Sequence, residues 1–369
     1  MPATNAVPGT AGPIPFKDVV VVIDNDDHDD GAEAIPRQPA AAAAAAEEYR
    51  GIVAALPSKL PGTPQRMRLY QGSWFREDWV LGFVAIQRRF APRDGDVVLA
   101  SLPKCGTTWL KALAFATAAR AAYPPGPALA ATGGGGEPHP LLRLNPHDCV
   151  PFMEAVYFAG DEARLAAAPS PRLMSTHASF SVLPASITDN PGCKIVYICR
   201  QPKDMLVSYW HFINRSKSNA MSFSDVWDSI HEGTYFGSPI WEHILEYWRA
   251  SQAMPDRVLF LRYEDIQRDP VKNVEKIAEF IGQPFSDAEK EAGIVESIVD
   301  LCSLQRLKAN SGAKNAGFRR VVNVEVPNES YFRKGAVGDW VNYVTPEMAE
   351  SLDKFLADKF RGSGFTFAE

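Results

Sequence analysis

The segment from Val97 to Lys111, VVLASLPKCGTTWLK, constrains the fold of this chain more than any other part of the sequence. It begins with a continuous apolar run, which is typical of a strand buried on both faces of a parallel sheet. Pro103 and Gly106 then predict a sharp turn, and we expect a helix to begin near Thr107. The first amides of a helix lack internal hydrogen-bond partners and lie at the positive end of its dipole. The segment therefore predicts a backbone site for a phosphate-like anion.

Lys104 adds a full positive charge to this turn, but its spacing differs from that of the phosphate-binding loop of nucleoside triphosphatases. That loop places a glycine five residues before a Gly-Lys pair. Here Lys104 instead precedes Gly106 by two positions. A plainer interpretation is a strand, turn and helix in which Thr107 or Thr108 only caps the helix. The grouping of lysine, glycine and two threonines favours the anion site.

The composition restricts the class of protein. A chain of 369 residues with 46% hydrophobic content can bury the core of one large α/β domain. Its formal net charge of −6 argues against a general surface for nucleic acid or an anionic membrane, so any anion site must be local. The five cysteines form no Cys-x-x-Cys pair, which favours a reducing compartment over a disulfide framework or a zinc cluster.

Two stretches are expected to lie outside the packed core. Residues 1–45 are rich in Ala, Pro and Asp and predict a disordered tail. The acidic run at 24–30 could be a metal site, but a solvated tail is favoured because nothing fixes the ligands. The N-terminal sequence predicts no signal peptide, transit peptide or membrane span, so we expect a soluble cytoplasmic protein. Residues 123–139, rich in Pro and Gly, predict a flexible loop.

The rest of the chain alternates strands and helices. Apolar runs at 194–199 and 257–263 predict further buried strands. Each is followed by a helix with a proline in its first turn, Pro202 or Pro270, and a last helix is expected after Thr345. This alternation predicts a single α/β domain with a central parallel sheet flanked by helices.

Polar and cationic residues follow the predicted strands. Ligands of an open parallel sheet bind beyond the carboxyl ends of its strands, where Lys104, Arg200 and Tyr263 all fall. Ser208 could join Arg200 in binding one phosphate, although Arg200 alone could also cap a helix or form an ion pair. Later, YFRKGAVGDW at 331–340 places two adjacent cations beside glycines that let the backbone approach an anion. That segment by itself could be a solvated basic turn.

Four segments in a fixed order make the chain resemble a known family. They read LPKCGTTWLKAL at 102–113, ICRQPKDMLVSYWHF at 198–212, LFLRYEDIQRDP at 259–270 and YFRKGAVGDW at 331–340. With them the chain resembles the cytosolic sulfotransferases that use 3′-phosphoadenosine 5′-phosphosulfate (PAPS), and among these the plant branch. The likeness implies a P-loop-NTPase-like sulfotransferase fold over residues 46–369. It also implies PAPS as co-substrate, adenosine 3′,5′-bisphosphate (PAP) as product, and no metal.

The resemblance implies a role for each matching residue. The loop and helix start would hold the 5′-phosphosulfate and the adenine through Lys104, Cys105, Gly106, Thr107, Thr108 and Trp109, and Tyr263 would also contact the base. The 3′-phosphate would be held by Arg200, Ser208, Arg333, Lys334 and Gly335. Phe152 and Phe212 match positions that line the acceptor pocket in relatives, although ordinary core packing explains either residue equally well.

The family also carries a catalytic histidine after a short strand, and RLMSTH at 172–177 supplies His177. A hydroxyl acceptor must lose its proton as it attacks sulfur, and a neutral imidazole is a suitable base near neutral pH. Without the resemblance, a histidine after a strand is more often structural. Lys104 and the loop amides would stabilise the charge that develops on the departing phosphate during in-line transfer. The expected partner is a small, largely apolar phenol, flavonoid, steroid-like or hormone-like alcohol, with no nucleic acid and no membrane.

The sequence departs from the family at several positions. Ser175 stands where some animal members have lysine, and Leu304 stands where an adenine-stacking phenylalanine is common. Cys105 replaces a serine of the animal loop. Beside Lys104 at a helix N-terminus its thiol would have a lowered pKa and would oxidise readily, although a buried inert cysteine is an equal alternative. The dimerisation motif of mammalian members is incomplete at 341–350, so we expect a monomer or a weak dimer.

Two other classes of function remain open from the sequence alone. One is a nucleoside-phosphate kinase or NTPase, since VLFLRYED at 258–265 resembles an apolar strand that ends in a magnesium-binding carboxylate. The missing Walker glycine argues against it. The other is a catalytically silent protein that binds PAP. His177 and Lys104 together argue against that class, because binding alone needs no base.

Overall fold

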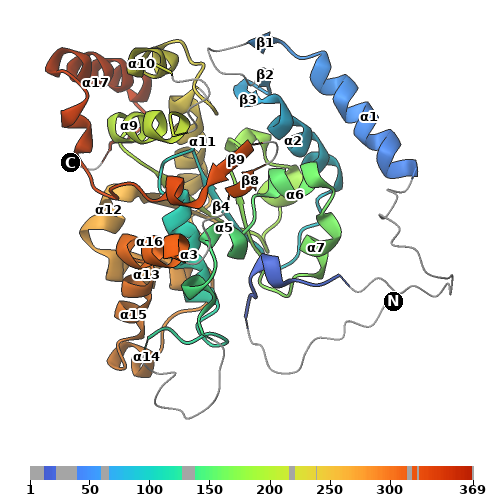
Figure 1. The fold of residues 1–369 in the computed structure, drawn as a ribbon, viewed down its shortest axis with the longest axis vertical. Coiled ribbons are helices and arrows are strands. Elements are labelled where there is room, and N and C mark those ends of the chain that lie inside the picture. Colours follow the sequence, from blue (N-terminus) through green and yellow to red (C-terminus); the bar gives the residue numbers. More distant parts are fainter. Residues whose placement is uncertain are drawn as a thin grey trace.

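The computed structural model describes residues 12–21, 40–59, 66–126, 138–215, 221–237, 239–313, 318–321 and 324–367. At its centre lies a four-stranded parallel sheet in the order β5-β4-β6-β7 (Figure 1). The strands are β4 (Val97–Ser101), β5 (Leu173–Thr176), β6 (Lys194–Cys199) and β7 (Val258–Arg262). In the register, Val97 lies opposite Leu173 on one side and Lys194 on the other. All four strands therefore end at the same edge of the sheet.

Alternate residues of these strands supply two apolar cores, one on each face of the sheet. Along β4, Val98 and Ala100 belong to one core, whereas Val97 and Leu99 belong to the other. Successive side chains of a strand point to opposite faces, so a strand covered on both sides must be apolar throughout. This requirement explains why every residue of β4 is buried.

Helices cover both faces. The core that contains Val97 is completed by α3 (Thr107–Ala118), α13 (Pro270–Phe280) and α15 (Ile294–Leu301). The opposite core is completed by α2 (Glu77–Arg89), α6 (Met153–Ala159), α9 (Pro202–Ile213), α10 (Phe223–His231), α11 (Ile240–Ala253) and α17 (Pro346–Phe360). In Figure 1, α13 to α16 gather on one side of the molecule, and α1, α2, α6 and α7 lie on the other. The prediction of an α/β domain with a central parallel sheet flanked by helices is confirmed.

The other elements lie around this core. An antiparallel sheet of β1 (Ser58–Lys59), β2 (Met67–Tyr70) and β3 (Ser73–Arg76) precedes α2, and α1 (Ala40–Ala54) packs along α2. A second small sheet pairs β8 (Phe318–Val321) with β9 (Val324–Pro327) in antiparallel orientation. The short helices are α5 (Pro146–Cys149), α7 (Glu162–Ala167), α8 (Ala185–Thr188), α12 (Tyr263–Arg268), α14 (Asp287–Glu291) and α16 (Leu304–Ala313). The 3-10 turns are η1 (Phe16–Asp18), η2 (Pro140–Leu142), η3 (Phe180–Val182), η4 (Asn328–Tyr331) and η5 (Asp339–Asn342). The two small sheets and α12 were not predicted, because strands and helices this short show no clear periodicity.

The structure confirms the helix starts that were predicted near the site. Pro202 is the first residue of α9, and Pro270 is the first residue of α13. The Asp269 side chain caps α13 by accepting a hydrogen bond from the backbone amide of Lys272, the third residue of the helix. Two predicted features, the acidic run at 24–30 and residues 127–137 of the flexible loop, lie outside the described residues.

The prediction of a disordered tail over residues 1–45 was wrong for two segments. α1 begins before the predicted end of the tail, and residues 12–21 contain the turn η1. Val19 is buried, and Asp18 forms an ion pair with Arg143 at 2.5 Å. A few apolar residues are thus enough to dock this segment on the core, although the composition around them is typical of disorder.

Gly82 allows α2 to lie directly against α6. A Cβ atom at Gly82 would lie 2.4 Å from the carbonyl oxygen of Glu154. We expect Gly82→Ala to lower the free energy of unfolding by about 1–3 kcal/mol, because the two backbones would have to separate. Gly51→Ala in α1 is a matched control. No described atom lies within 4 Å of its added Cβ, so the exchange should stabilise that helix, by about 0.5–1 kcal/mol. Urea unfolding measures both values, and equal effects would contradict the close contact.

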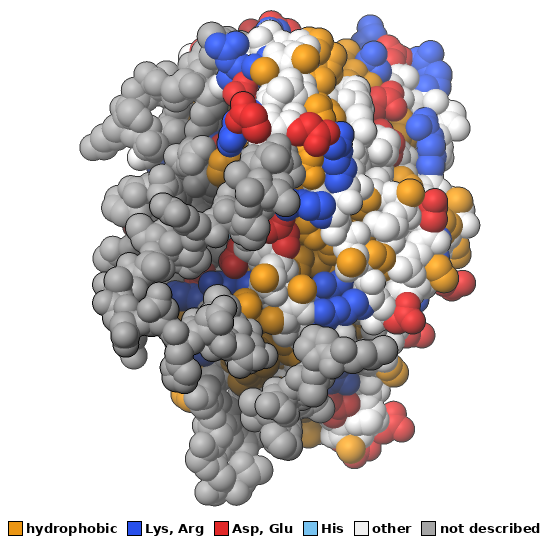
Figure 2. Space-filling model, turned by 90° about the vertical axis from the view of Figure 1, so that its right-hand side faces the viewer, with side chains coloured by type: hydrophobic (Ala, Val, Ile, Leu, Met, Phe, Trp, Pro, Cys, Tyr) orange, Lys and Arg blue, Asp and Glu red, His pale blue; other side chains and the backbone are white. Residues whose placement is uncertain are grey.

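The outer surface carries charges of both signs. On the face shown in Figure 2, Lys and Arg side chains are interspersed with Asp and Glu, and hydrophobic side chains lie between them. Within the described ranges, every helix is too short or too polar to cross a lipid bilayer. A concentrated group of cations lies instead inside a cavity at the carboxyl edge of the central sheet.

Candidate active site

A cavity of about 790 Å³ lies where the central strands end. The loop after β4, the residue after β5, the residue after β6, the second half of α9, the start of α12 and the segment 330–335 all contribute to its walls. Parallel sheets commonly place ligands at this edge, because the loops that follow the strands meet there. The lining divides into a group of cations with the β4 loop and a group of aromatic side chains.

The loop after β4 holds a backbone conformation that few residues adopt. Lys104 and Gly106 both have positive φ angles, 68° and 100°. A Cβ atom at Gly106 would lie 2.7 Å from a ring carbon of Tyr263, so glycine is required there. The hydroxyls of Ser101 and Thr107 lie 2.6 Å apart and tie the end of β4 to the start of α3. The loop can thus present the unpaired amides at the start of α3 to an anion in the cavity.

Lys104 lies among other cations. Burial, together with the nearby charges of Arg215, Arg200 and Arg333, lowers the pKa of Lys104 to about 7. Its Nζ lies 4.1 Å from the centroid of the Phe212 ring. These like charges repel one another, which costs free energy in the empty site. An anion bound among them would be attracted by all of them at once. The group is suited to a ligand with several negative charges.

Arg200 is only 6% exposed and is held from several sides. Its guanidinium donates a hydrogen bond to the carbonyl of Ala336 at 2.8 Å and lies 4.4 Å from the centroid of the Tyr263 ring. Its Nε has no hydrogen-bond partner among the described residues. A buried guanidinium with an open donor is suited to a phosphate, and Ser208 of α9 lines the cavity with it.

Arg333 and Lys334 are both held by one carboxylate. Lys334 Nζ lies 2.7 Å from Asp339 Oδ1, and Arg333 pairs with the other oxygen of Asp339. Burial alone would raise the pKa of Asp339, but the hydrogen bonds from Lys334 and Arg333 lower it to about 2. Asp339 is therefore ionised at neutral pH and keeps both cations at the edge of the cavity.

Trp109, Tyr263 and Leu304 line an apolar part of the cavity near these cations. The rings of Trp109 and Tyr263 lie edge to face, with centroids 5.5 Å apart. The Tyr263 hydroxyl donates to the carbonyl of Gly335 at 3.1 Å, and a Cβ atom at Gly335 would lie 2.9 Å from Leu304. Apolar and aromatic surfaces of this kind suit the flat face of a nucleobase.

His177 follows β5 and is 8% exposed. Its Nδ1 lies 2.7 Å from the carbonyl oxygen of Ser101. A carbonyl only accepts hydrogen bonds, so Nδ1 carries the proton of the neutral ring and Nε2 keeps its lone pair. Burial lowers the pKa of His177 to about 3, which keeps the imidazole neutral at physiological pH. The histidine is therefore held in the tautomer that can accept a proton at Nε2.

Glu154 fixes the backbone that carries His177. Its carboxylate accepts hydrogen bonds from the Thr176 hydroxyl and from the His177 amide, the latter at 2.8 Å. The side chain is fully buried, and burial raises the pKa of Glu154 to about 7 although the Thr176 hydrogen bond opposes this. The role of Glu154 was not predicted from the sequence, because its contact with β5 joins segments far apart in the chain.

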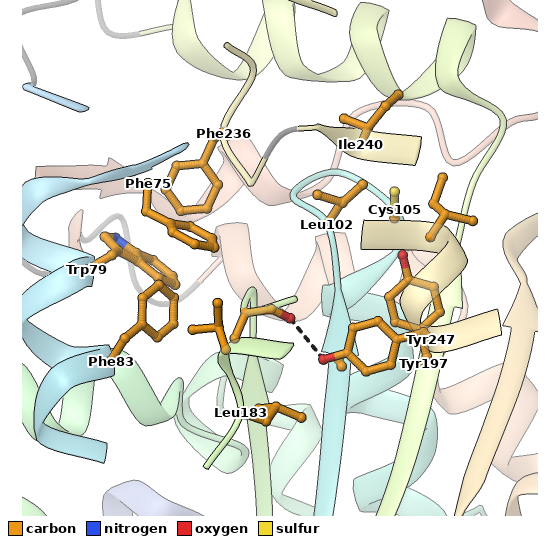
Figure 3. Close-up of a cluster of buried hydrophobic side chains, with 14 of the residues drawn as sticks. Phe75, Trp79, Phe83, Leu102, Cys105, Leu183, Tyr197, Phe236, Ile240 and Tyr247 are labelled. Atoms are coloured by element: carbon orange, nitrogen blue, oxygen red, sulfur yellow. Dashed lines mark hydrogen bonds between the residues drawn. The ribbon is translucent and has the colours of Figure 1, made fainter. Parts of the chain in front are cut away.

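Aromatic rings surround His177. Its ring centroid lies 5.3 Å from that of Trp79, which is stacked on it, and 4.8 Å from that of Phe152. The Phe236 ring lies edge to face with both Trp79, at 5.3 Å, and His177, at 6.0 Å. Figure 3 shows Trp79 and Phe236 packed with Phe75 and Phe83 in a continuous apolar cluster. The space next to His177 is thus suited to an apolar compound.

The hypothesis of a reactive, low-pKa Cys105 is wrong. Its side chain is 1% exposed and lies near Leu102 and Ile240 in the apolar cluster of Figure 3. Burial raises the pKa of the Cys105 thiol to about 12 and outweighs the nearby charge of Arg200. The thiol is therefore directed into the core, and it is absent from the residues that line the cavity.

We expect the native protein to show no fast-reacting thiol. All five cysteines are free and buried, so Ellman's reagent should react slowly with the folded chain and rapidly with five thiols after denaturation. Peroxide should inactivate wild type and Cys105→Ser at the same rate. A single thiol that reacts rapidly together with loss of activity, and that is missing from Cys105→Ser, would contradict this account.

The cavity brings together every predicted site residue except Cys105. These residues are Lys104, Gly106, Thr107, Thr108, Trp109, Phe152, His177, Arg200, Ser208, Phe212, Tyr263, Arg333, Lys334 and Gly335. Other lining residues were not predicted from the sequence, among them Trp79, His147, Arg215, Tyr235 and Phe236. They lie outside the four motifs and do not directly follow a predicted strand, so nothing in the sequence marked them as site residues. In the described ranges, no group of three or more His, Cys, Asp or Glu side chains is placed to hold a metal ion.

Comparison with known proteins shows consistent similarity along most of the chain. A family model for the sulfotransferase domain matches residues 94–364. Cytosolic sulfotransferase 8 of Arabidopsis thaliana is 39% identical over 322 residues, which cover 86% of this chain and 92% of the relative. Cytosolic sulfotransferase 5 of the same organism is 38% identical over 330 residues, 87% of this chain and 97% of the relative.

Solved structures share the fold. A sulphotransferase from Arabidopsis thaliana has a TM-score of 0.68 at 33% sequence identity, covering 91% of this chain and 100% of that chain. A mouse sulfotransferase complexed with PAP has a TM-score of 0.60 at 25% identity, covering 80% of this chain and 95% of that chain. The fold expected from the four sequence motifs is thus confirmed.

Proposed function

The chain belongs to the sulfotransferase family, and from that premise we propose that it transfers a sulfuryl group from PAPS to a hydroxyl group of a small, largely apolar acceptor. The observation that carries the proposal is the cavity in which several cations, the β4 loop and a buried neutral histidine converge. The mouse relative complexed with PAP supports the nucleotide. The names of the plant relatives support a cytosolic location for this chain.

The polar part of the cavity fits the donor. Lys104 and the first amides of α3 would hold the 5′-phosphosulfate, and Trp109 and Tyr263 would contact the adenine. The 3′-phosphate would lie at the cations around Arg200, in the group formed by Arg200, Ser208, Arg333, Lys334 and Gly335. The open Nε of Arg200 is an observation that favours an anion there.

His177 would act as the general base. Its Nε2 would accept the proton of the acceptor hydroxyl as the acceptor oxygen forms a bond to sulfur. The bond from sulfur to the bridging oxygen of the 5′-phosphate breaks in the same step, and PAP leaves with that electron pair. Lys104 and the loop amides would stabilise the charge that develops on this oxygen. The residues then act by positioning and electrostatics, without a covalent enzyme intermediate.

The aromatic part of the cavity would bind the acceptor. Trp79, Phe152 and Phe236 offer flat apolar surfaces next to His177, and Phe212 and Tyr235 line the same cavity. These surfaces favour a phenol or an alcohol on an apolar ring system. The incomplete dimerisation motif at 341–350 favours a monomer or a weak dimer.

One assay tests the proposal against its alternatives. The protein is incubated with PAPS labelled with ³⁵S and a panel of phenols, flavonoids, steroids and apolar alcohols, and in parallel with γ-labelled ATP. Label should pass from PAPS to at least one acceptor and not from ATP. Transfer from ATP alone would support a kinase. Tight PAP binding without transfer to any acceptor would support a silent nucleotide-binding protein.

A further inference from the structure

A buried chain of polar side chains runs from the core of α3 to the cavity. Lys111 of α3 is 0% exposed, and its Nζ lies 2.9 Å from Nδ1 of His147. The other ring nitrogen of His147, Nε2, lies 2.9 Å from the hydroxyl of Thr108. His147 is itself 2% exposed, whereas Thr108 lines the cavity directly. His147 and Thr108 thus connect the buried Lys111 to the cavity at the start of α3.

The chemistry of these groups fixes the direction of each hydrogen bond. A lysine ammonium can only donate, so Nδ1 of His147 must accept. The neutral ring then carries its proton on Nε2 and donates it to the Thr108 oxygen. Because the Thr108 oxygen accepts this hydrogen bond, its own hydroxyl proton remains available to a different acceptor. Thr108 lines the cavity, so the proton can point into the cavity.

We propose that Lys111 and His147 are positioning residues that hold the Thr108 hydroxyl as a fixed hydrogen-bond donor toward the transferred sulfuryl end of PAPS. The inference deepens the proposed function and rests on it. A hydroxyl without such a relay can turn and serve as either donor or acceptor, whereas a sulfonate or phosphate oxygen only accepts. Fixing the donor direction in advance removes the reorganisation that would otherwise accompany the reaction.

The position of the relay favours the sulfuryl end over the adenine end. Phe152 lies between the two histidines, 5.4 Å from the ring of His147 and 4.8 Å from that of His177. The Nζ of Lys111 lies 3.5 Å from the centroid of the same Phe152 ring. The charge of Lys111 also acts on both Glu154 and His177. The relay therefore lies on the side of the loop that faces the proposed base.

The test is a double-mutant cycle on the full chain with labelled PAPS. Lys111→Met keeps a long unbranched side chain but cannot donate to His147, and Thr108→Val removes the hydroxyl. We expect each variant to lower kcat by about tenfold to 100-fold, as for the loss of a charge-assisted hydrogen bond. If Lys111 acts through Thr108, the double variant should be no slower than Thr108→Val alone. Additive losses, or an unchanged kcat in Lys111→Met, would overturn the proposal.

A second pair of variants separates the relay from packing. The amide of His147→Gln can still accept from Lys111 and donate to Thr108, so it should retain more activity than His147→Leu. Calorimetry should show that His147→Leu and Lys111→Met keep the melting temperature of wild type within a few degrees. Equal activity of the Gln and Leu variants, or losses of activity that follow losses of melting temperature, would indicate packing only.

A measurement without PAPS adds a readout that does not depend on activity. In ¹⁵N-histidine-labelled wild-type protein, the His147 ring should show a protonated Nε2 and an unprotonated Nδ1, with the signals identified by their absence from His147→Gln. The opposite tautomer would overturn the proposal. A wild-type protein that transfers no label from PAPS would instead contradict the proposed function itself.

Discussion

Replacing His177 with alanine should lower kcat by about 10²–10⁴-fold, the usual contribution of a positioned general base. The imidazole is held in one tautomer by the Ser101 carbonyl, and alanine leaves no group there that can accept the proton of the acceptor. Binding of PAP should change little, because the cations proposed to hold the nucleotide come from other segments. Steady-state kinetics with ³⁵S-labelled PAPS and calorimetric titration with PAP measure the two effects.

His231→Ala is the matched control. His231 lies on α10 against Phe355 and does not line the cavity, so its removal should leave kcat within about twofold of wild type. The pH dependence offers a further check. Because the pKa of His177 is lowered to about 3, its protonation should not reduce kcat/KM between pH 5 and pH 8. If His177→Ala transferred the sulfuryl group as fast as wild type, His177 could not be the general base.

Lys104→Met should lower kcat by about 10²–10³-fold, the effect of removing one preorganised group that stabilises developing charge. The substitution keeps the length of the side chain and removes only its charge. Lys308→Met is the control, because Lys308 is exposed on α16 and does not line the cavity. Equal kcat values for the two variants would contradict a role for Lys104 in the chemical step.

The lowered pKa of Lys104 also predicts a proton linkage. In the free protein Lys104 begins to lose its proton near pH 7, and a bound polyanion favours the charged form and raises this pKa. At pH 8 the binding of PAP should therefore take up about one proton, and the affinity should fall as pH rises above 7. Titrations in buffers of different ionisation enthalpy measure the uptake, which should be absent from Lys104→Met. Equal proton uptake by Lys104→Met and wild type would assign it to another group.

The sequence predicted those parts of the site that depend on local chain geometry. A buried strand, a glycine turn and a helix start are encoded within a few neighbouring residues, so the loop from Pro103 to Thr107 could be predicted in place. Arg200 and Tyr263 could also be predicted, because each directly follows a strand of the parallel sheet. The family resemblance then assigned roles that local geometry alone could not.

The errors and omissions share one physical cause, which is contact between distant segments. Cys105 has the local surroundings of a reactive thiol, but the core formed by α11 and β6 buries its side chain. Glu154 and His147 gain their importance from partners on β5 and α3, which no pattern near them in the sequence reveals. The same holds for Trp79, which reaches His177 from α2.

The central claim is that separate segments form a site for an adenosine nucleotide with phosphates on both the 3′ and 5′ oxygens, and calorimetric titration tests it most directly. PAP should bind at least about 100-fold more tightly than adenosine 5′-monophosphate, because the 3′-phosphate adds charge-assisted hydrogen bonds. Arg200→Ala should reduce this ratio and leave the affinity for the monophosphate nearly unchanged. Equal affinities of the wild-type protein for the two nucleotides, or a ratio that Arg200→Ala does not alter, would contradict the account.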